Sequence, residues 1–245
     1  MRLSELADYS LSDYSLSQAV VFRDSLNPRL FEDFKLLPEV RNQLLKIAQD
    51  FQDFLGIDNL EVSDITISGS NAAYTYTPHS DIDLHLLVDI AELDHSEVYR
   101  ELFDAKKFQY NNMHDITIAG YDVELYVQDS RQEHHSLGIY SVLHDTWVSE
   151  PKQIKPDVDD LSVRSKVQKL SDKIVRSLGT TDRAQAEKVW QSIKDMRKTG
   201  LSSGGEFSTE NLAFKVLRTQ GLLKDLLAHI HKLRDQELSL PEQVS

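Results

Sequence analysis

Two aspartates and a Gly-Ser pair are the residues of this chain whose types and spacing best suit chemistry. Asp81 and Asp83 flank one isoleucine, and ten residues separate them from Gly69-Ser70. Because side chains alternate along a strand, the two aspartates share one face. Carboxylates on one face repel each other, and a divalent cation is the simplest compensation. The N–H groups and hydroxyl of a Gly-Ser turn suit phosphates that would share this cation, so the pattern predicts a metal and nucleotide site.

The arrangement resembles the signature of DNA polymerase β-like nucleotidyltransferases, in which an apolar residue and Gly-Ser precede Asp–apolar–Asp–apolar. Three further stretches resemble predicted nucleotidyltransferases of tailed phages: Leu26 to Phe31, Val123 to Asp129 and Phe207 to Arg218. The resemblance covers most of the chain. It implies an α+β fold in which a polymerase β-like domain, a small mixed sheet with flanking helices, precedes an α-helical domain. The alternative is a hairpin turn followed by a solvated edge strand.

In that family a third carboxylate comes from a strand beside the paired aspartates, and Glu124 is the candidate here. It stands between apolar neighbours, where a charge needs a reason. Three carboxylates can hold two Mg²⁺ ions, or Mn²⁺ in their place, for in-line phosphoryl displacement. Asp122, at the start of this strand, and Asp129, past its end, are the fallback candidates. Alternatively, Glu124 is an exposed residue of a hairpin.

The same resemblance implies that Gly69 and Ser70 contact the β- and γ-phosphates of a nucleotide. In the loop that follows, Tyr74 or Tyr76 could stack on a base, although packing is the alternative role. His85 projects to the face of the aspartates, either as a proton acceptor or as a satisfied polar residue under a neighbouring loop. The other histidines singled out for their spacing, at positions 134, 135 and 144, are too irregular for a metal site and are expected on the surface.

Near the C-terminus, Asn211, Lys215 and Arg218 recur at i, i+4 and i+7 on a helix predicted from Ser208 to Arg234. This spacing puts them on one face, away from the apolar stripe. Lys215 and Arg218 could bind a triphosphate, with arginine offering two donors. A solvated helix face is the alternative. The preceding segment 202–205, Ser-Ser-Gly-Gly, is predicted to be a flexible loop that could hinge.

Composition limits the class of protein. The 245 residues are 40% apolar, which is enough for one domain with a helical extension. Cysteine is absent, which excludes disulfides and thiolate metal sites. No apolar run reaches membrane-spanning length and no signal-peptide core is visible, so we expect a soluble cytoplasmic protein, in the host cytoplasm if it is phage-encoded.

The net charge of −13 is unevenly placed. Residues 1–150 have 10 basic against 27 acidic side chains, a balance of −17, whereas residues 151–245 have 17 against 13, a balance of +4. An acidic total disfavours undirected binding to polyanions. The basic part could supply cations to phosphates held by the acidic part, with ordinary surface variation as the alternative.

The helices and strands that must position these residues are predicted from the periodicity of apolar residues and from the proline, glycine and capping residues at their ends. We expect an N-terminal arm over 1–37, a catalytic domain over 38–150 and a helical domain over 157–245, joined by a linker between Pro151 and Pro156. Within the catalytic domain, an amphipathic helix begins at Pro38 and ends before Gly56, and strands cover Ile65 to Ser68 and Ile82 to Val88.

Later elements follow from the same signals. A helix is expected over 96–107, and a hairpin joins 115–119 to 122–127 around Gly120. In the helical domain, Asp157 is the expected cap of a helix closed by Gly179, and a second helix runs from Thr181-Asp182 to Thr199-Gly200. Trp147 and Trp190 are expected to anchor the core of this domain.

These observations predict an enzyme. It would be a Mg²⁺-dependent nucleotidyltransferase that transfers a nucleoside monophosphate from an NTP to a hydroxyl group and releases pyrophosphate. The acidic charge favours a small or short acceptor over a long nucleic acid. Two alternatives stay open: a template-independent RNA or tRNA 3′-end nucleotidyltransferase, and a non-catalytic nucleotide-binding regulatory protein. A structural or partner-binding role in a virion would rest on the phage resemblance alone.

Overall fold

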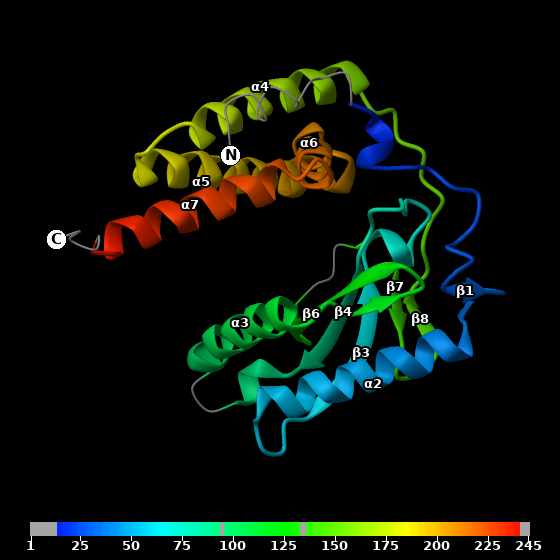
Figure 1. Cartoon of the computed structure of the whole chain (residues 1–245). Coiled ribbons are helices and arrows are strands. Elements are labelled where there is room, and N and C mark those ends of the chain that lie inside the picture. Colours follow the sequence, from blue (N-terminus) through cyan, green and yellow to red (C-terminus); the bar gives the residue numbers. More distant parts are fainter. Residues whose placement is uncertain (1–13, 94–95, 133–135, 241–245) are drawn as a thin grey trace. The chain divides into compact units, whose positions relative to one another are not determined.

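The computed structural model describes residues 14–93, 96–132 and 136–240, and the chain divides into two compact units (Figure 1). Val21–Lys155 form the α/β unit. Met1–Val20 and Pro156–Ser245 form the helical unit. Residues 21–37 of the expected arm therefore belong with the α/β unit. Residues 1–13 of that arm, and the histidines at 134 and 135, lie outside the described residues.

A six-stranded mixed sheet forms the centre of the α/β unit, in the order β5-β6-β4-β3-β7-β8. Strands β4 and β6 are parallel, and the other neighbouring strands are antiparallel. The strands are β3 (Val62–Ser68), β4 (Ile82–Val88), β5 (Thr117–Ile118), β6 (Tyr121–Asp129), β7 (Ile139–Ser141) and β8 (Thr146–Ser149).

One face of this sheet is the core. Along β4, Ile82, Leu84, Leu86 and Val88 are buried, while the residues between them are only partly buried. This alternation is the expected signature of a strand with one packed face. The other face of β4 and β6 is therefore the one that presents their charged side chains. The hairpin of β5 and β6 turns at Ala119 and Gly120, both with positive φ, as a two-residue turn requires.

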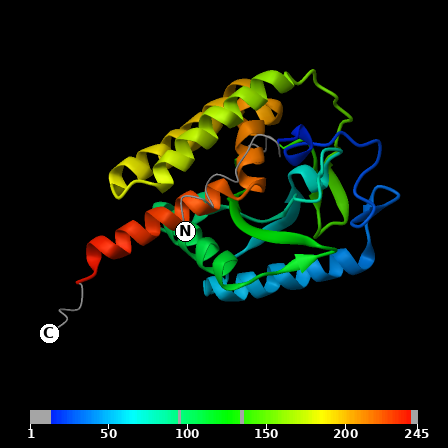
Figure 2. The same cartoon turned by 45° about the horizontal axis from the view of Figure 1, so that its top comes forward.

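Helices α2 (Pro38–Leu55) and α3 (Ser96–Met113) cover the apolar face (Figure 1, Figure 2). The start of α2 at proline and its end at Gly56, which adopts the left-handed conformation, confirm the predicted bounds. Helix α3 is longer than expected and runs beyond residue 107. The ring of Tyr110 on α3 packs edge-on against Phe51 of α2, which joins the two helices over the sheet.

A small hairpin of β1 (Phe31–Glu32) and β2 (Lys35–Leu36) completes the α/β unit. Trp147 of β8 packs against it: its ring is stacked on Phe31 with 5.3 Å between centroids. The prediction that Trp147 anchors the helical domain is therefore wrong, because its strand pairs with β7 at the edge of the sheet.

The helical unit contains α4 (Asp160–Leu178), α5 (Arg183–Gly204), α6 (Thr209–Thr219) and α7 (Leu222–Leu238). The cap of α4 is Asp159, which accepts the Ser162 N–H, and not the predicted Asp157. Its end at Gly179 is as expected. Trp190 lies on α5 and is half-buried. Among the described helices, none is long and apolar enough to cross a membrane.

Two predictions about glycine in this unit are wrong. The expected loop at 202–205 is mostly the last turn of α5, because Gly200 does not end the helix: a Cβ there would lie 2.4 Å from Cβ of Glu210, so this glycine allows close packing against α6. The expected single helix from Ser208 to Arg234 is divided at Gly221, whose φ is 80°. A left-handed residue interrupts a helix.

Candidate metal and nucleotide site

Three carboxylates meet where β4 and β6 run in parallel. Asp81 immediately precedes β4, and Asp83 is paired directly with Glu124 across the two strands. Each residue offers a carboxylate oxygen, and these oxygens lie within 4.8 Å of one another. All three residues are half-buried. Hard divalent cations prefer oxygen ligands, so this acidic group could hold a metal, and the structure brings together the three residues that the sequence suggested.

The register of β6 separates Glu124 from the fallback candidates. The neighbours of Glu124 are buried in the core, and a shift by one residue would exchange the two faces. Asp129 is buried and accepts a hydrogen bond from the Arg100 guanidinium at 2.6 Å. Burial raises the pKa of Asp129, but the bonds and charges of Arg100 and Arg131 outweigh it and leave the pKa lowered. Asp122 is exposed and pairs with Thr117.

Gly69 makes room for Asp83. Its φ is 76°, and a Cβ at this position would lie 2.2 Å from Asp83 Oδ2. Any side chain would displace this carboxylate, so glycine is required for a steric reason. The Gly69 N–H donates to Ser136 Oγ at 3.0 Å. A phosphate bound by this N–H would therefore have to replace Ser136, a residue that sequence reasoning missed.

Hydrogen bonds tie the turn to the aspartates. Ser70 begins the 3₁₀ turn η3 (Ser70–Ala72), and its Oγ lies 2.7 Å from Ser80 Oγ. Asn71 Nδ2 donates to the backbone oxygen of Asp81 at 2.9 Å, and Asn71 Oδ1 accepts from Asn27 Nδ2 at 2.8 Å. Both asparagines are 1% exposed. Sequence reasoning missed Asn27, although it lies in the stretch Leu26 to Phe31 that carries part of the resemblance.

Tyr126 orients the third carboxylate. Its hydroxyl donates to Glu124 Oε2 at 2.5 Å. Burial raises the pKa of the Tyr126 phenol, and the nearby charges of Asp83 and Glu124 raise it further, so it stays a donor. A carboxylate has two oxygens, and this bond leaves the second one of Glu124 for a cation. Its place two residues after Glu124, on the same strand face, was the signal that could have identified Tyr126.

His85 lies on β4, two residues after Asp83, and contacts other side chains of the same unit. Its Nε2 is 3.1 Å from Ser68 Oγ, and its ring is stacked on Tyr126 with 4.9 Å between centroids and 17° between planes. Lys107 from α3 lies over the ring of Tyr126, 5.2 Å from its centroid. These contacts show that His85 packs on Tyr126 and helps to fix its ring.

The two tyrosines of the loop differ. Tyr76 is buried, and the Arg23 guanidinium lies 4.6 Å from its ring centroid. The packing role therefore applies to Tyr76. Tyr74 is only partly buried and lines a pocket together with Phe31 and Phe34.

The predicted phosphate-binding cations lie on α6 of the helical unit. Lys215 is half-buried and Arg218, in the last turn of α6, is exposed. Asn211 does not share an exposed face with them: it is buried, accepts a bond from Arg197 Nε at 3.2 Å and donates to the Glu206 carbonyl at 2.8 Å. The expected polar face of three residues is thus reduced to two.

Comparisons with known proteins add little to this description. No family model matches the sequence, and no curated protein matches it. Among solved structures, the STING-associated c-di-GMP synthase CdnE from Capnocytophaga granulosa is similar over 95% of this chain and 90% of that chain, with 12% sequence identity and a TM-score of 0.22. A likeness this slight carries no argument. What stands is a mixed α+β protein with an acidic group, Asp81, Asp83 and Glu124, that could bind a metal.

Proposed function

We propose that this protein is a Mg²⁺-dependent nucleotidyltransferase that transfers a nucleoside monophosphate from an NTP to a hydroxyl of a small or short acceptor. The observation that carries the proposal is the convergence of Asp81, Asp83 and Glu124 at one point of the sheet, with the Gly69 turn packed directly on Asp83. In this proposal the α/β unit is the catalytic domain.

Phosphoryl transfer needs positioning and charge stabilisation more than covalent chemistry from the protein. Two bound Mg²⁺ ions would supply that stabilisation and would lower the pKa of the attacking hydroxyl. The protein's part is to hold the carboxylates in place. Gly69 leaves space for Asp83, the Asn71 side chain holds the backbone beside Asp81, and Tyr126 fixes Glu124.

We also propose that Gly69, Ser70, Lys215 and Arg218 bind the phosphates of the nucleotide. Ser70 supports this assignment because its hydroxyl belongs to the turn that contacts Asp83. Lys215 and Arg218 are proposed on their charge, since cations on a helix suit a triphosphate. The α/β unit has 11 basic against 24 acidic residues, a balance of −13. This charge supports a small acceptor, because phosphate contacts dominate binding to long nucleic acids.

The test is release of pyrophosphate. The full chain is incubated separately with ATP, GTP, CTP and UTP in the presence of Mg²⁺ and a pool of small metabolites, and pyrophosphate is measured with and without a chelator. Mass spectrometry of the pool then identifies the acceptor. Release that requires Mg²⁺ is expected with at least one NTP. Release only when RNA replaces the metabolites would favour the 3′-end alternative, and nucleotide binding without release would favour the regulatory one.

A further inference from the structure

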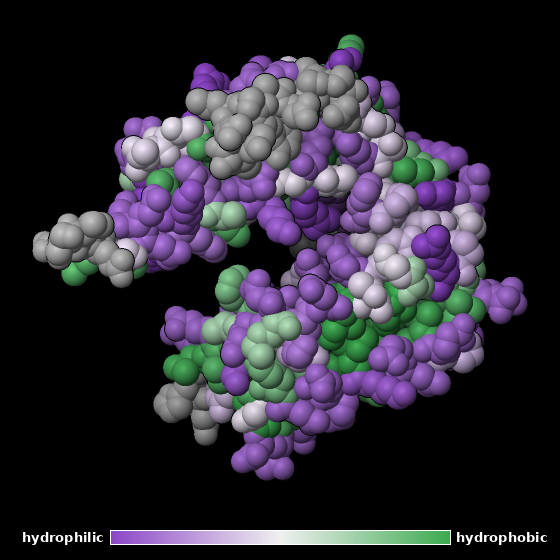
Figure 3. All heavy atoms as spheres, in the orientation of Figure 1, coloured by the Kyte–Doolittle hydropathy of each residue, from purple (hydrophilic) through white to green (hydrophobic). Residues whose placement is uncertain are grey.

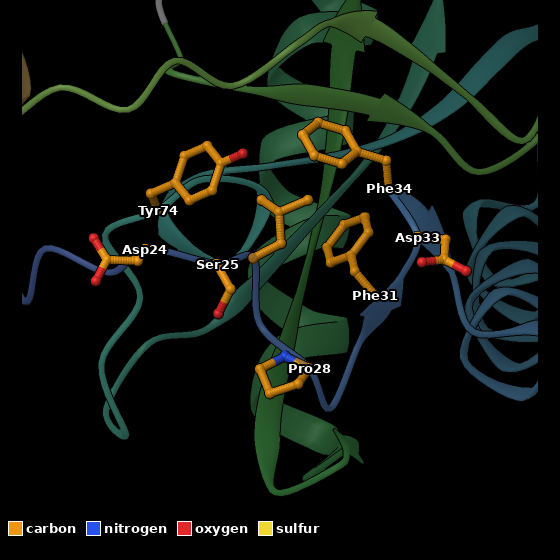
Figure 4. A pocket seen from close by; sticks show the side chains of 8 residues that line it. Asp24, Ser25, Pro28, Phe31, Asp33, Phe34 and Tyr74 are labelled. Atoms are coloured by element: carbon orange, nitrogen blue, oxygen red, sulfur yellow. The ribbon is translucent and has the colours of Figure 1, made fainter.

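A pocket of about 290 Å³ lies in the α/β unit between the segment before β1, the turn from β1 to β2, and the loop after η3 (Figure 4). Its lining combines two aliphatic side chains, Leu26 and Pro28, with three aromatic rings. Phe31 and Phe34 come from the hairpin, and Tyr74 comes from the loop that leads to the aspartates. Ligand pockets are typically concave and apolar with a few polar groups.

The three rings differ in how firmly they are held. Phe31 is buried, and its other face is stacked on Trp147, so it forms a fixed wall. Tyr74 packs in part against the core. Phe34 is 48% exposed, although it is a large apolar side chain. Figure 4 shows Tyr74 on one side of the group and Phe31 and Phe34 on the other, with Asp24 and Asp33 at opposite ends.

The backbone at Phe34 is unusual for such a residue. Its φ is 64°, and Asp33 before it has a φ of 46°. A two-residue hairpin turn needs this conformation, but glycine or asparagine normally occupies it, and a bulky residue there is strained. The Trp147 Nε1–H donates to the Phe34 carbonyl at 2.8 Å and holds the turn. An exposed aromatic ring kept at a cost in free energy indicates a function for that ring.

The polar groups of the pocket select the ligand. Its charged lining residues are Asp24 and Asp33, and no basic side chain is among the lining residues. Asp24 is an exposed partner of Lys155 at 3.3 Å. Carboxylates accept hydrogen bonds from N–H groups and repel phosphates. Aromatic faces favour planar rings. Because Asp24 is already paired with Lys155, Asp33 is the carboxylate available to a ligand. We propose that this pocket binds a planar heteroaromatic ring carrying an amino group, with the ring stacked on Phe34 and Tyr74 and the amino group donating to Asp33.

Tyr74 is the one lining residue that the sequence suggested for stacking on a base, and none of the lining residues is a proposed ligand of metal or phosphate. The inference can therefore be tested separately from the proposed function. The experiment therefore omits both Mg²⁺ and NTP. Trp147 supplies the signal, since its ring lies against Phe31 and 6.2 Å from the ring of Phe34. Replacing Trp190 by Phe leaves Trp147 as the one tryptophan of the chain. The probes are adenosine and cytidine, which carry an amino group, uridine, which does not, and choline, which is a cation without a ring.

Adenosine and cytidine are expected to change the Trp147 emission saturably, and uridine and choline at least roughly tenfold more weakly. Phe34→Gly should weaken adenosine binding by roughly tenfold or more, which is within the range for the loss of one stacking contact. Glycine accepts the positive φ, so this variant should keep its fold. Asparagine suits the turn as well as aspartate does, so Asp33→Asn should keep the fold and should weaken the binding of adenosine by a smaller factor than Phe34→Gly. Phe108→Ala removes an exposed ring on α3 and should change nothing.

Several results would overturn the inference. One is the absence of a saturable signal with adenosine and cytidine at millimolar concentration. Another is equal affinity of uridine or choline, which would mean that the amino group or the ring is not recognised. A third is unchanged adenosine affinity in Asp33→Asn together with Phe34→Gly. Should Phe34→Gly not fold, Asp33→Asn and the comparison of adenosine with uridine on the parent chain still decide the question. Pyrophosphate release is unaffected by these outcomes, so failure here is distinguishable from failure of the proposed function.

Discussion

The two units differ in net charge. The α/β unit has a balance of −13, whereas the helical unit has 16 basic and 16 acidic residues and is neutral. The balance of +4 expected for residues 151–245 disappears because segment 1–20, with a balance of −2, belongs to the same unit, whereas Lys152 and Lys155 belong to the α/β unit. In Figure 3 the hydrophilic side chains cover most of the visible surface, and the hydrophobic ones gather mainly on the part that belongs to the α/β unit.

A glycine with a close neighbour occurs in each unit, and the kind of neighbour differs. Gly69 and Gly200 both sit where a Cβ would collide with a neighbour, at 2.2 Å and 2.4 Å. At Gly69 the neighbour is the carboxylate of Asp83, and at Gly200 it is a helix side chain, Glu210. The same steric device makes room for a carboxylate of the acidic group in one unit and packs two helices in the other. Close approach by itself therefore does not identify a functional glycine; the chemistry of the neighbour does.

The largest effect is expected from Asp83→Asn. Loss of a charged ligand at the centre of the acidic group should reduce Mg²⁺-dependent pyrophosphate release by about a hundredfold or more. Asp122→Asn is the matched control, because Asp122 is an exposed carboxylate at the start of β6. It should leave release unchanged. Normal turnover in Asp83→Asn, or equal losses in both variants, would remove the distinction between the acidic group and the rest of this acidic unit.

Gly69→Ala should be more damaging than Gly221→Ala. Both glycines have a positive φ, but a Cβ at Gly221 would meet nothing within 4 Å. Gly221→Ala should therefore cost only the backbone strain, about 1–2 kcal/mol. Gly69→Ala adds the collision with Asp83, for a total of roughly 2–4 kcal/mol. Urea unfolding can be followed for each unit separately in single-tryptophan backgrounds, with Trp147 reporting on the α/β unit in Trp190→Phe and Trp190 reporting on the helical unit in Trp147→Phe. Equal costs would show that Asp83 moves aside freely.

Removal of Lys215 or Arg218 tests whether the helical unit takes part in nucleotide binding. One charge-assisted bond to phosphate is worth about 1.5–3 kcal/mol, so either alanine variant should weaken ATP roughly ten- to a hundredfold and AMP much less. Calorimetric titration measures both. Lys224→Ala, at an exposed position of α7, serves as the control. Parent-like ATP affinity in both variants would mean that this face of α6 does not bind the nucleotide.

The smallest effect concerns acid stability. Asp129 of the α/β unit and Glu210 of the helical unit both have lowered pKa values. Burial raises the pKa of Asp129, but Arg100 outweighs it; for Glu210 the bond from Lys166 is the main cause. Because each pKa is lower in the folded state, its stabilisation is complete above the unfolded value, about pH 4, and is lost as the pH falls through the folded value.

Asp129→Asn should cost roughly 1–2 kcal/mol at neutral pH, since Asp129 is only 5% exposed but its partner is half in solvent. Glu210→Gln should cost less, about 0.5–1 kcal/mol, because both partners of that pair are partly exposed. Urea unfolding at pH 7 and pH 3 checks both: each variant should differ less from the parent at pH 3. A difference that grows in acid would contradict the assigned direction.

Local patterns predicted much of the α/β unit. The apolar pattern of β4 defined the strand Ile82 to Val88 and the face of Asp83, the apolar neighbours of Glu124 on β6 defined its face, and Pro38 with Gly56 bounded α2. These signals lie within a few residues of the element that they describe. The bond from Asn27 to Asn71 could not be predicted, because the fold brings together residues 44 apart that have no shared periodicity.

The helical unit was harder to predict because glycine has several roles. Gly200 looked like a helix end and is a packing position, whereas Gly221 stands inside an apolar stripe and ends a helix. Sequence alone does not distinguish these cases, since the deciding contact comes from another helix. The cap at Asp159 instead of Asp157 is an error of two residues, typical where several capping residues are adjacent.

The division of the chain has a consequence for the order in which it is synthesised. The α/β unit is one uninterrupted segment, whereas the helical unit is assembled from both ends of the sequence: Tyr14 donates to the Asp160 carboxylate at 2.6 Å, and Thr219 donates to the Gln18 carbonyl, 201 positions away. On the ribosome, the sheet with its acidic group can therefore form while the first residues still await their partners. Loss of residues 14–20 would remove the hydrogen bonds that Tyr14 and Gln18 make within the helical unit.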